Sequence, residues 1–313
     1  MESVLRTHHL GKRYGSRWAV RDLNLEVLKG EVFGFLGPNG AGKSTTIRML
    51  LSLIRPTTGD VELFEKSLRR NRRECLARVG GLVEEADFYL YLSARKNLEI
   101  VGTMRGGVGR KEVDRVLDIV GLSERADDRV KTYSHGMKQR LGIAQSLLGN
   151  PECVVLDEPT TGLDPQGIKE VRDLVRQLSA DRRMTIFLSS HLLSEIEQTA
   201  TSMAIIHQGT LLVQGTVQEL LSASANVVRF EVQPLEQARI VLTQDPAVRE
   251  VRVEGDALVV SVAREETARL NAKLINAGVE VRALVPRRSL EDYFLNLTEV
   301  ESAAESSRGK DHA

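Results

Sequence analysis

Apolar runs alternate with amphipathic stretches from Glu2 to about Leu221. Four of the runs are short and uniformly apolar, at residues 32–36, 154–157, 185–189 and 203–207. Uniformly apolar runs are typical of strands that are buried on both faces of a parallel sheet. Their alternation with helical patterns predicts an α/β domain with a largely parallel sheet. Gln208-Gly209 after the last run predicts a tight turn into a hairpin.

The pattern becomes helical between Glu85 and Leu148. Three segments there repeat their apolar residues at helical spacing, at 95–104, 111–120 and 136–148. We predict that residues 85 to 150, approximately, form a helical insertion in the α/β domain.

The composition changes near Ser222, where small residues predict a short linker. The order over 226–299 then reads strand, helix, strand, strand, helix, strand, which is the order of the α+β ferredoxin-like unit. Ser289 is expected to cap a further short helix, and the small polar residues 300–313 are expected to be a disordered tail. The sequence therefore predicts two domains, at 1–222 and 226–299.

The bulk composition narrows the class of protein. The 43 Lys and Arg residues balance 43 Asp and Glu residues, which argues weakly against a general nucleic-acid binder. No run of about 18 apolar residues is present, and the N-terminal residues lack an apolar signal core, so neither a membrane span nor export is expected. The two cysteines suggest no disulfide framework, which favours the cytoplasm.

The segment Gly37–Thr45, GPNGAGKST, fits the pattern G-x-x-x-x-G-K-[ST] of loops that wrap nucleotide phosphates. A strand is predicted directly before it and a helix at 44–53 directly after it, which is the context that the motif requires. Gly40 and Gly42 permit a turn in which successive N–H groups point at an anion, and the helix N-terminus adds partial positive charge.

Side chains of this loop and of two other strand ends complete the predicted site. Lys43 is expected to reach the β and γ phosphates, and the Ser44 hydroxyl is expected to bind Mg²⁺. Asp157 and Glu158 end an apolar strand, so Asp157 is a candidate for the Mg²⁺ shell and Glu158 for the base that activates water. His191 follows the next strand and is a candidate γ-phosphate ligand, although a lone histidine there is more often a capping residue.

Further segments carry a resemblance to a known family. Residues 133–140, YSHGMKQR, resemble the signature segment LSGGQ-x-x-R of ABC transporter ATPases, and Gly162-Leu163-Asp164 resembles their D-loop. His191 resembles their switch histidine, and Tyr14 sits where they stack an aromatic ring on adenine, with Trp18 as a rival. The resemblance covers roughly Leu5 to Leu221.

The resemblance implies a P-loop NTPase of the ABC type that binds ATP and Mg²⁺ between two copies joined head to tail. Lys43, Glu158 and His191 would be catalytic, and Ser44, Glu84 and Asp157 would lie at the metal. The nucleotide would be contacted by Tyr14, Gly37, Asn39, Gly40, Ala41, Gly42, Lys43, Ser44 and Thr45 of one copy and by Ser134 and Gly136 of the other. Ser134 also has the chemistry of a helix N-cap, and a capped helix start suits an anion.

The sequence departs from the family pattern at three positions. His135 and Met137 replace the usual Gly and Gln of the signature segment. Glu84 replaces a Gln that joins Mg²⁺, as in ATPases of the bacitracin-export and lantibiotic-immunity type. A carboxylate binds Mg²⁺ more strongly than an amide does and repels phosphate without it, so Glu84 is expected to make nucleotide binding more dependent on Mg²⁺.

Three other segments have weaker interpretations. Phe88–Leu92 is expected to be partly core and partly a surface that receives a membrane subunit. The arginines of Arg69–Arg73 could touch anionic lipid, although a solvated charged face is the commoner role. His8-His9 point to opposite faces of a strand, which is poor geometry for a metal.

The resemblance therefore implies the ATP-hydrolysing subunit of an ABC exporter, acting as a homodimer on separately encoded permease subunits at the inner face of the cell membrane. Its cargo would be a drug, a peptide antibiotic or a lipid. A soluble ABC-type ATPase that acts on ribosomes or nucleic acid is the alternative. A non-hydrolytic ATP sensor is disfavoured because Lys43, Asp157, Glu158 and His191 are all present.

Overall fold

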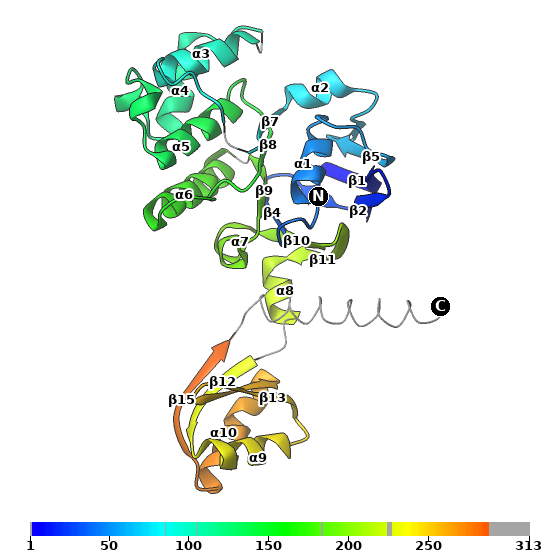
Figure 1. Cartoon of the computed structure of the whole chain (residues 1–313), viewed down its shortest axis with the longest axis vertical. Coiled ribbons are helices and arrows are strands. Elements are labelled where there is room, and N and C mark those ends of the chain that lie inside the picture. Colours follow the sequence, from blue (N-terminus) through cyan, green and yellow to red (C-terminus); the bar gives the residue numbers. More distant parts are fainter. Residues whose placement is uncertain (1, 85, 105, 183, 224–226, 288–313) are drawn as a thin grey trace. The chain divides into compact units, whose positions relative to one another are not determined.

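The computed structural model describes residues 2–84, 86–104, 106–182, 184–223 and 227–287. The chain forms two compact units, Met1–Val217 and Gln218–Ala313 (Figure 1).

A six-stranded sheet runs through the first unit. Its strands are β4 (Val32–Leu36), β7 (Val79–Leu82), β8 (Cys153–Leu156), β9 (Thr185–Ser190), β10 (Ser202–His207) and β11 (Thr210–Thr216). The strand order is β11-β10-β4-β9-β8-β7, and every pair is parallel except β10–β11. The four apolar runs of the sequence are therefore confirmed as β4, β8, β9 and β10. Gln208 and Gly209, with φ of 46° and 85°, make the expected hairpin turn.

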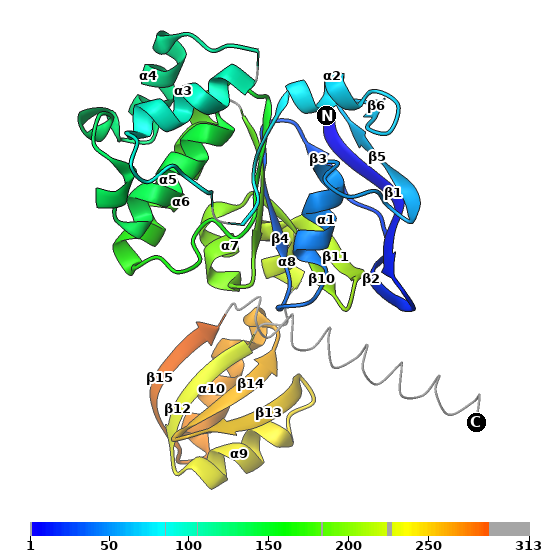
Figure 2. The same cartoon turned by 45° about the horizontal axis from the view of Figure 1, so that its top comes forward.

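A second, antiparallel sheet packs against the first in the same unit. Its strands are β1 (Ser3–Tyr14), β2 (Arg17–Leu23), β3 (Glu26–Leu28), β5 (Thr58–Leu63) and β6 (Lys66–Ser67). One core joins the two sheets through Leu5 and Leu10 of β1, Phe33 and Phe35 of β4, and Ile47 of helix α1 (Lys43–Leu50). Figure 2 shows α1 between the strands of the two sheets.

Most of the other helices of the first unit lie on the side of the six-stranded sheet that faces away from the antiparallel sheet (Figure 2). The three helices expected between residues 85 and 150 are present as α3 (Ala94–Met104), α4 (Arg110–Ile119) and α5 (His135–Ser146), with short 3₁₀ turns at Ser123–Arg125 and Val130–Thr132. The remaining helices are α2 (Arg72–Ala77), α6 (Pro165–Arg182) and α7 (Leu193–Thr199). None of the helices in the described ranges is both long and apolar enough to cross a bilayer.

The second unit has the ferredoxin-like order of elements. Helix α8 (Val217–Ala223) precedes β12 (Val227–Gln233), α9 (Leu235–Thr243), β13 (Val248–Glu254), β14 (Ala257–Val262), a 3₁₀ turn at Arg264–Glu266, α10 (Thr267–Asn276) and β15 (Glu280–Arg287). The sheet order is β13-β14-β12-β15, and all pairs are antiparallel. This topology confirms the α+β part of the predicted fold class. The helix expected at Ser289 and the tail at 300–313 lie outside the described residues.

A buried carboxylate ties together the second unit. Asp245 accepts hydrogen bonds from Arg269 at 2.6 and 3.0 Å, from Lys273 Nζ at 2.6 Å and from the Ala247 N–H at 3.1 Å. The hydrogen bonds from Arg269 and Lys273 hold the pKa of Asp245 well below its usual range, although burial alone would raise it. Asp245 is therefore charged in the folded unit, and it links the end of α9 to α10.

Asp245→Asn is expected to destabilise the second unit by about 2 kcal/mol, because two cations lose their charged acceptor. The lowered folded-state pKa means that the contribution of Asp245 is complete above about pH 5 and is lost as the pH falls through that pKa. Hydrogen exchange of β12 and α10 amides in the full chain measures both effects. Asp256→Asn, on an exposed carboxylate of the same unit, should change exchange little, and equal effects of the two variants would contradict this role of Asp245.

Candidate functional site

The phosphate loop of the sequence lies between β4 and α1, as its pattern requires. Gly40 and Gly42 have φ of 82° and 109°, a region that favours glycine. A Cβ atom on Gly42 would lie 2.5 Å from the Ala19 carbonyl oxygen, and one on Gly37 would lie 2.4 Å from the Ile206 carbonyl oxygen. Glycine is therefore needed at 42 for conformation and space, and at 37 for space.

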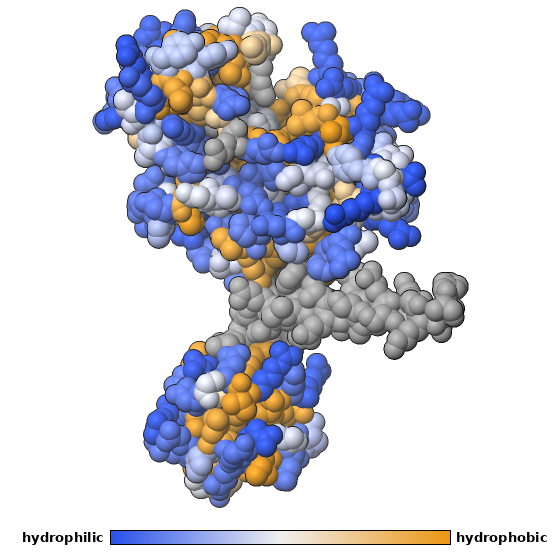
Figure 3. Space-filling model, in the orientation of Figure 1, coloured by the Kyte–Doolittle hydropathy of each residue, from blue (hydrophilic) through white to orange (hydrophobic). Residues whose placement is uncertain are grey.

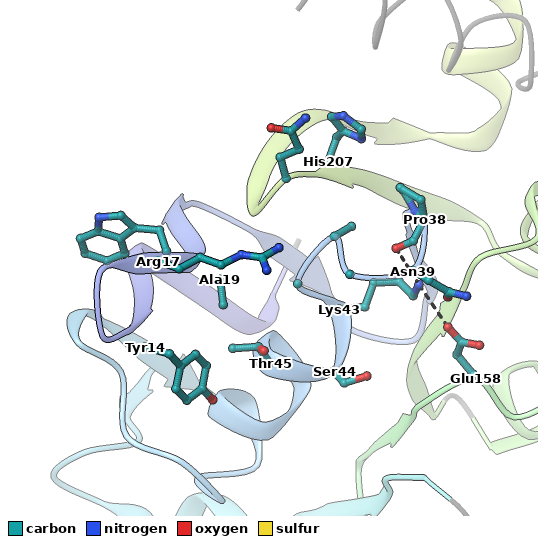
Figure 4. Close-up of a pocket in the computed structure, with 15 residues that line it drawn as sticks. Tyr14, Arg17, Ala19, Pro38, Asn39, Lys43, Ser44, Thr45, Glu158 and His207 are labelled. Carbon is teal, nitrogen blue, oxygen red and sulfur yellow. Dashed lines mark hydrogen bonds and ion pairs between the residues drawn. The ribbon is translucent and has the colours of Figure 1, made fainter. Parts of the chain in front are cut away.

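The loop forms one wall of a cavity of about 840 Å³. Figure 4 shows residues of the loop, of β1 and β2, of the β10–β11 turn and of the end of β8 around it. The lining residues are Tyr14, Arg17, Trp18, Ala19, Pro38, Asn39, Gly40, Ala41, Gly42, Lys43, Ser44, Thr45, Glu158, His207 and Gln208. Of the predicted site residues, the cavity thus gathers Tyr14, the loop residues 39–45 and Glu158.

Lys43 is held at the centre of this wall. Its side chain is only 5% exposed, and Nζ donates to the Gly37 carbonyl at 2.7 Å and lies 3.1 Å from Glu158 Oε1. Figure 4 shows the Lys43 and Glu158 side chains pointing toward one another. The carboxylate of Glu158 therefore occupies the anionic position beside Lys43 in this structure.

Glu158 has two further partners on its other oxygen. Thr161 Oγ1 donates to Glu158 Oε2 at 2.9 Å, and His191 Nδ1 lies 2.9 Å from the same oxygen. Burial raises the pKa of Glu158, but the hydrogen bonds from Lys43, Thr161 and His191 together outweigh it and hold the pKa below its usual value. Glu158 is thus ionised at neutral pH, as a proton acceptor must be.

Asp157 is fixed directly behind this group. Ser189 Oγ donates to Asp157 Oδ1 at 2.6 Å and accepts from the Glu158 N–H at 2.9 Å. Both Asp157 and Ser189 are buried. One serine of β9 therefore holds the Asp157 carboxylate and the backbone of Glu158, and sequence reasoning did not single it out.

Two aromatic rings line the cavity. Tyr14 and Trp18 both line it, with Tyr14 half exposed and Lys12 Nζ 5.2 Å from the centre of the Tyr14 ring. Tyr14 was predicted to stack on adenine in preference to Trp18, and both residues line the cavity. Arg17, His207 and Gln208 were missed, because their place depends on the β1–β2 and β10–β11 turns and not on a local motif.

The signature residues Ser134 and Gly136 do not line this cavity. Ser134 is the N-cap of α5, and its Oγ accepts from the Met137 N–H at 3.2 Å. His135, in place of the usual glycine, lies with Nε2 3.4 Å from the Thr161 carbonyl oxygen. The N-cap chemistry expected of Ser134 is thus present, on a part of the surface apart from the phosphate loop.

Glu84 also lies outside the lining of the cavity. It has a φ of 60°, its side chain is 66% exposed, and it forms an ion pair with Arg48 of α1. Among the described residues, no cluster of three or more His, Cys, Asp or Glu side chains suits a metal. His8 and His9 pair separately with Glu62 at 3.2 Å and with Asp22 at 2.6 Å.

A glycine-rich loop with a buried lysine at a helix N-terminus, facing strand-end carboxylates, defines a P-loop nucleotide-binding protein. The family model described as ABC transporter matches residues 20–161. The chain is 42% identical to the bacitracin transport ATP-binding protein of Bacillus licheniformis over 299 residues, which are 95% of this chain and 98% of that protein.

Two further comparisons agree. The lantibiotic transport ATP-binding protein of Streptococcus pyogenes is 41% identical over 211 residues, 67% of this chain and 90% of its own length. A solved component of an ABC transporter complex of Clostridium perfringens superposes with a TM-score of 0.65 at 25% identity, over 79% of this chain and 97% of that one. The chain belongs to the ATP-binding subunits of ABC transporters, a family that hydrolyses ATP to power transport.

Ser189→Ala should lower kcat about tenfold with little change in KM, because the Asp157 carboxylate and the Glu158 backbone lose their common partner. Because the buried Asp157 oxygen and the Glu158 N–H would each lose a hydrogen-bond partner, the substitution should also lower the free energy of unfolding by about 1–2 kcal/mol. Steady-state ATPase assays and thermal unfolding measure the two effects. Ser179→Ala, which removes a bond to the Gly30 carbonyl away from the cavity, should leave kcat unchanged; a similar kcat for both variants would count against Ser189 as a positioning residue.

Proposed function

We propose that the chain is the ATP-hydrolysing subunit of an exporter and that the cavity along residues 37–45 binds ATP with Mg²⁺. The observation that carries the proposal is the buried Lys43, which is held beside an ionised Glu158 at the mouth of a glycine-rich loop. This arrangement is an anion site with a proton acceptor next to it. Tyr14 and Trp18, which line the cavity, offer rings on which adenine can stack.

The donor set suits magnesium. Ser44 lines the cavity, and the carboxylate of Asp157 is buried and accepts a hydrogen bond from Ser189. Hard oxygen donors of this kind are those that Mg²⁺ prefers, with water completing the shell. The ion would neutralise charge on the phosphate oxygens.

Lys43, Glu158 and His191 have separate roles in the proposed hydrolysis. Lys43 binds the β and γ phosphates once they displace Glu158 from its side chain. Glu158 accepts a proton from water as the water oxygen bonds to the γ phosphorus and the bond to the bridging oxygen breaks. His191, 2.9 Å from Glu158, donates to the γ phosphate and orients that carboxylate.

The position of Ser134 supports a homodimer. Ser134 and Gly136 lie at the start of α5, where the helix dipole favours an anion, but they do not line their own chain's cavity. A second copy in head-to-tail orientation would bring them to the γ phosphate from the open side. ATP would then be held between two chains.

The surface around residues 88–92 supports docking on a membrane subunit. Tyr89, Leu90 and Tyr91 are exposed, whereas Phe88 and Leu92 are half-buried. Asn97 fixes the backbone of Tyr89 through bonds of 2.8 and 3.2 Å. We call Tyr89, Leu90 and Tyr91 the docking surface. A rigid, exposed apolar surface favours a protein partner, here a separately encoded permease, which would place the chain at the inner face of the cell membrane.

The names of the relatives favour a peptide antibiotic as cargo. They concern bacitracin and lantibiotic transport, and those relatives cover most of this chain. The relatives reported above give no support to the alternative of an ATPase that acts on ribosomes or nucleic acid.

Glu158→Gln should lower kcat by about 10²-fold or more while ATP binding is retained, because an amide cannot accept the proton. Light scattering should then show a stable dimer with ATP and Mg²⁺. Glu152→Gln, at a glutamate that pairs with Arg78, is the control and should hydrolyse ATP normally. Hydrolysis at the parent rate by Glu158→Gln would remove Glu158 as the base.

Glu84→Gln should make ATP binding less dependent on Mg²⁺ by a factor of about two to five, because the carboxylate no longer repels phosphate when the metal is absent. Titration of ATP with and without Mg²⁺ gives the ratio of the two dissociation constants. Arg48→Gln frees Glu84 from its ion pair and should leave this ratio as large as in the parent or larger. The same ratio for Glu84→Gln and the parent would end this role for Glu84.

Tyr89→Ala should spare ATP binding but weaken association with the permease encoded by the neighbouring reading frame about tenfold, because Tyr89 is an exposed aromatic anchor. Co-purification in detergent is the measurement. Ile240→Ala removes a similarly exposed apolar side chain from the second unit and should have no effect. Unchanged co-purification of Tyr89→Ala would argue against the docking surface.

A further inference from the structure

The segment from Lys66 to Arg73 is rich in exposed basic residues. Five of its eight residues are cationic, namely Lys66, Arg69, Arg70, Arg72 and Arg73. All five side chains are exposed. The whole chain has no net charge, so this is a local concentration of positive charge and not a general property of the protein.

The arginines are held on a fixed turn. Leu68 and Cys75 on either side of them are buried. The N–H groups of Arg70 and Asn71 donate to the Ser67 carbonyl at 3.2 and 2.9 Å, and the Asn71 side chain donates to the same oxygen at 3.2 Å. A rigid turn loses little backbone entropy when its side chains bind a partner.

The positive charge of the segment is only partly neutralised by the chain itself. Glu74 is paired with Lys66. Arg72 donates to Ser52 Oγ at 2.8 Å and toward the Ser52 carbonyl at 3.4 Å, which are neutral acceptors. Arg69 and Arg70 precede α2 and Arg73 lies in its first turn, and within the described residues no acidic side chain forms an ion pair with these three. We call Arg69, Arg70 and Arg73 the arginine patch.

A series of contacts leads from Arg72, next to the arginine patch in the sequence, toward the segment that carries the docking surface. Arg72 contacts Ser52, and the next residue, Leu53, is exposed and donates its N–H to the Arg48 carbonyl at 2.8 Å. Arg48 in turn pairs with Glu84, five residues before Tyr89. In Figure 3, hydrophilic side chains project over the position of α2, next to an apolar area.

We propose that the arginine patch contacts the anionic phospholipid headgroups of the bilayer that surrounds the permease. The proposal rests on the proposed docking of the chain on a membrane subunit, which would bring this face close to the lipid. Guanidinium groups bind phosphate oxygens through paired hydrogen bonds, and unpaired arginines are attracted to a negatively charged leaflet. The patch would add a second, weak attachment that orients the chain under its permease.

The test is flotation of the full chain, without permease, on vesicles. One set contains phosphatidylglycerol and phosphatidylcholine in equal amounts, and the other contains phosphatidylcholine alone. The parent chain should bind the anionic vesicles only, and binding should weaken as salt is raised. Arg69→Gln, Arg70→Gln and Arg73→Gln together should weaken it by at least about tenfold, because each arginine near an anionic surface strengthens binding several-fold.

Two matched triple variants separate position from charge. Lysine at the same three positions keeps the charge and should retain most of the vesicle binding. Arg239→Gln, Arg249→Gln and Arg282→Gln together remove the same charge from exposed positions of the second unit and should bind like the parent. All variants should bind ATP normally, which shows that they are folded.

Three results would each overturn the proposal. The parent chain could bind neutral and anionic vesicles equally, or the second-unit triple variant could lose as much vesicle binding as the triple glutamine variant of the arginine patch. The third is binding of transfer RNA without binding of anionic vesicles. Co-purification with the permease in detergent needs no bilayer. A chain that binds the permease but not anionic vesicles therefore refutes the lipid contact and leaves the proposed function intact.

Discussion

The parallel register of β4, β8 and β9 is the constraint on which the site depends. Leu36 of β4 pairs with Ser190 of β9, and Leu156 of β8 pairs with Leu188 of β9. Glu158, two residues beyond Leu156, is therefore level with the end of β4, where the phosphate loop begins. The Gly37 N–H also donates to the Ser190 carbonyl at 3.3 Å, which fixes the start of the loop to the neighbouring strand. Distant segments of the chain meet because their strands end at one edge of the sheet.

At this edge of the sheet, the side chains that would bind a phosphate are already in place around the carboxylate of Glu158. Lys43, Thr161 and His191 all contact the carboxylate of Glu158, so Lys43 and His191, the two side chains expected to bind a γ phosphate, are already oriented. An incoming phosphate would exchange with a carboxylate of the same sign and would leave no buried cation without a partner. Preorganised donors of this kind lose little entropy when the substrate binds.

Much of this site could be predicted from the sequence because its motifs are local. The loop, the strand-end carboxylates and the uniformly apolar strands each show in a few consecutive residues. The antiparallel sheet, apart from a strand at the N-terminus, was not predicted, because β1 mixes buried and exposed residues without regular alternation and its pairing with β5 spans about fifty residues. Ser189 and Arg17 were missed for a related reason, since their roles arise from neighbouring strands and turns. The prediction that Glu84 lies at the metal stays open, because the ion pair with Arg48 holds it outside the lining of the cavity.

The proposed ATP site requires a second chain, since Ser134 does not line the cavity at the phosphate loop of its own chain. A structure of the chain bound to Mg²⁺ and a non-hydrolysable ATP analogue examines this requirement. The expected result is a head-to-tail dimer in which Lys43 of one copy and Ser134 of the other contact the same triphosphate. A nucleotide bound fully within one chain, with Ser134 exposed to solvent and far from any phosphate, would contradict it.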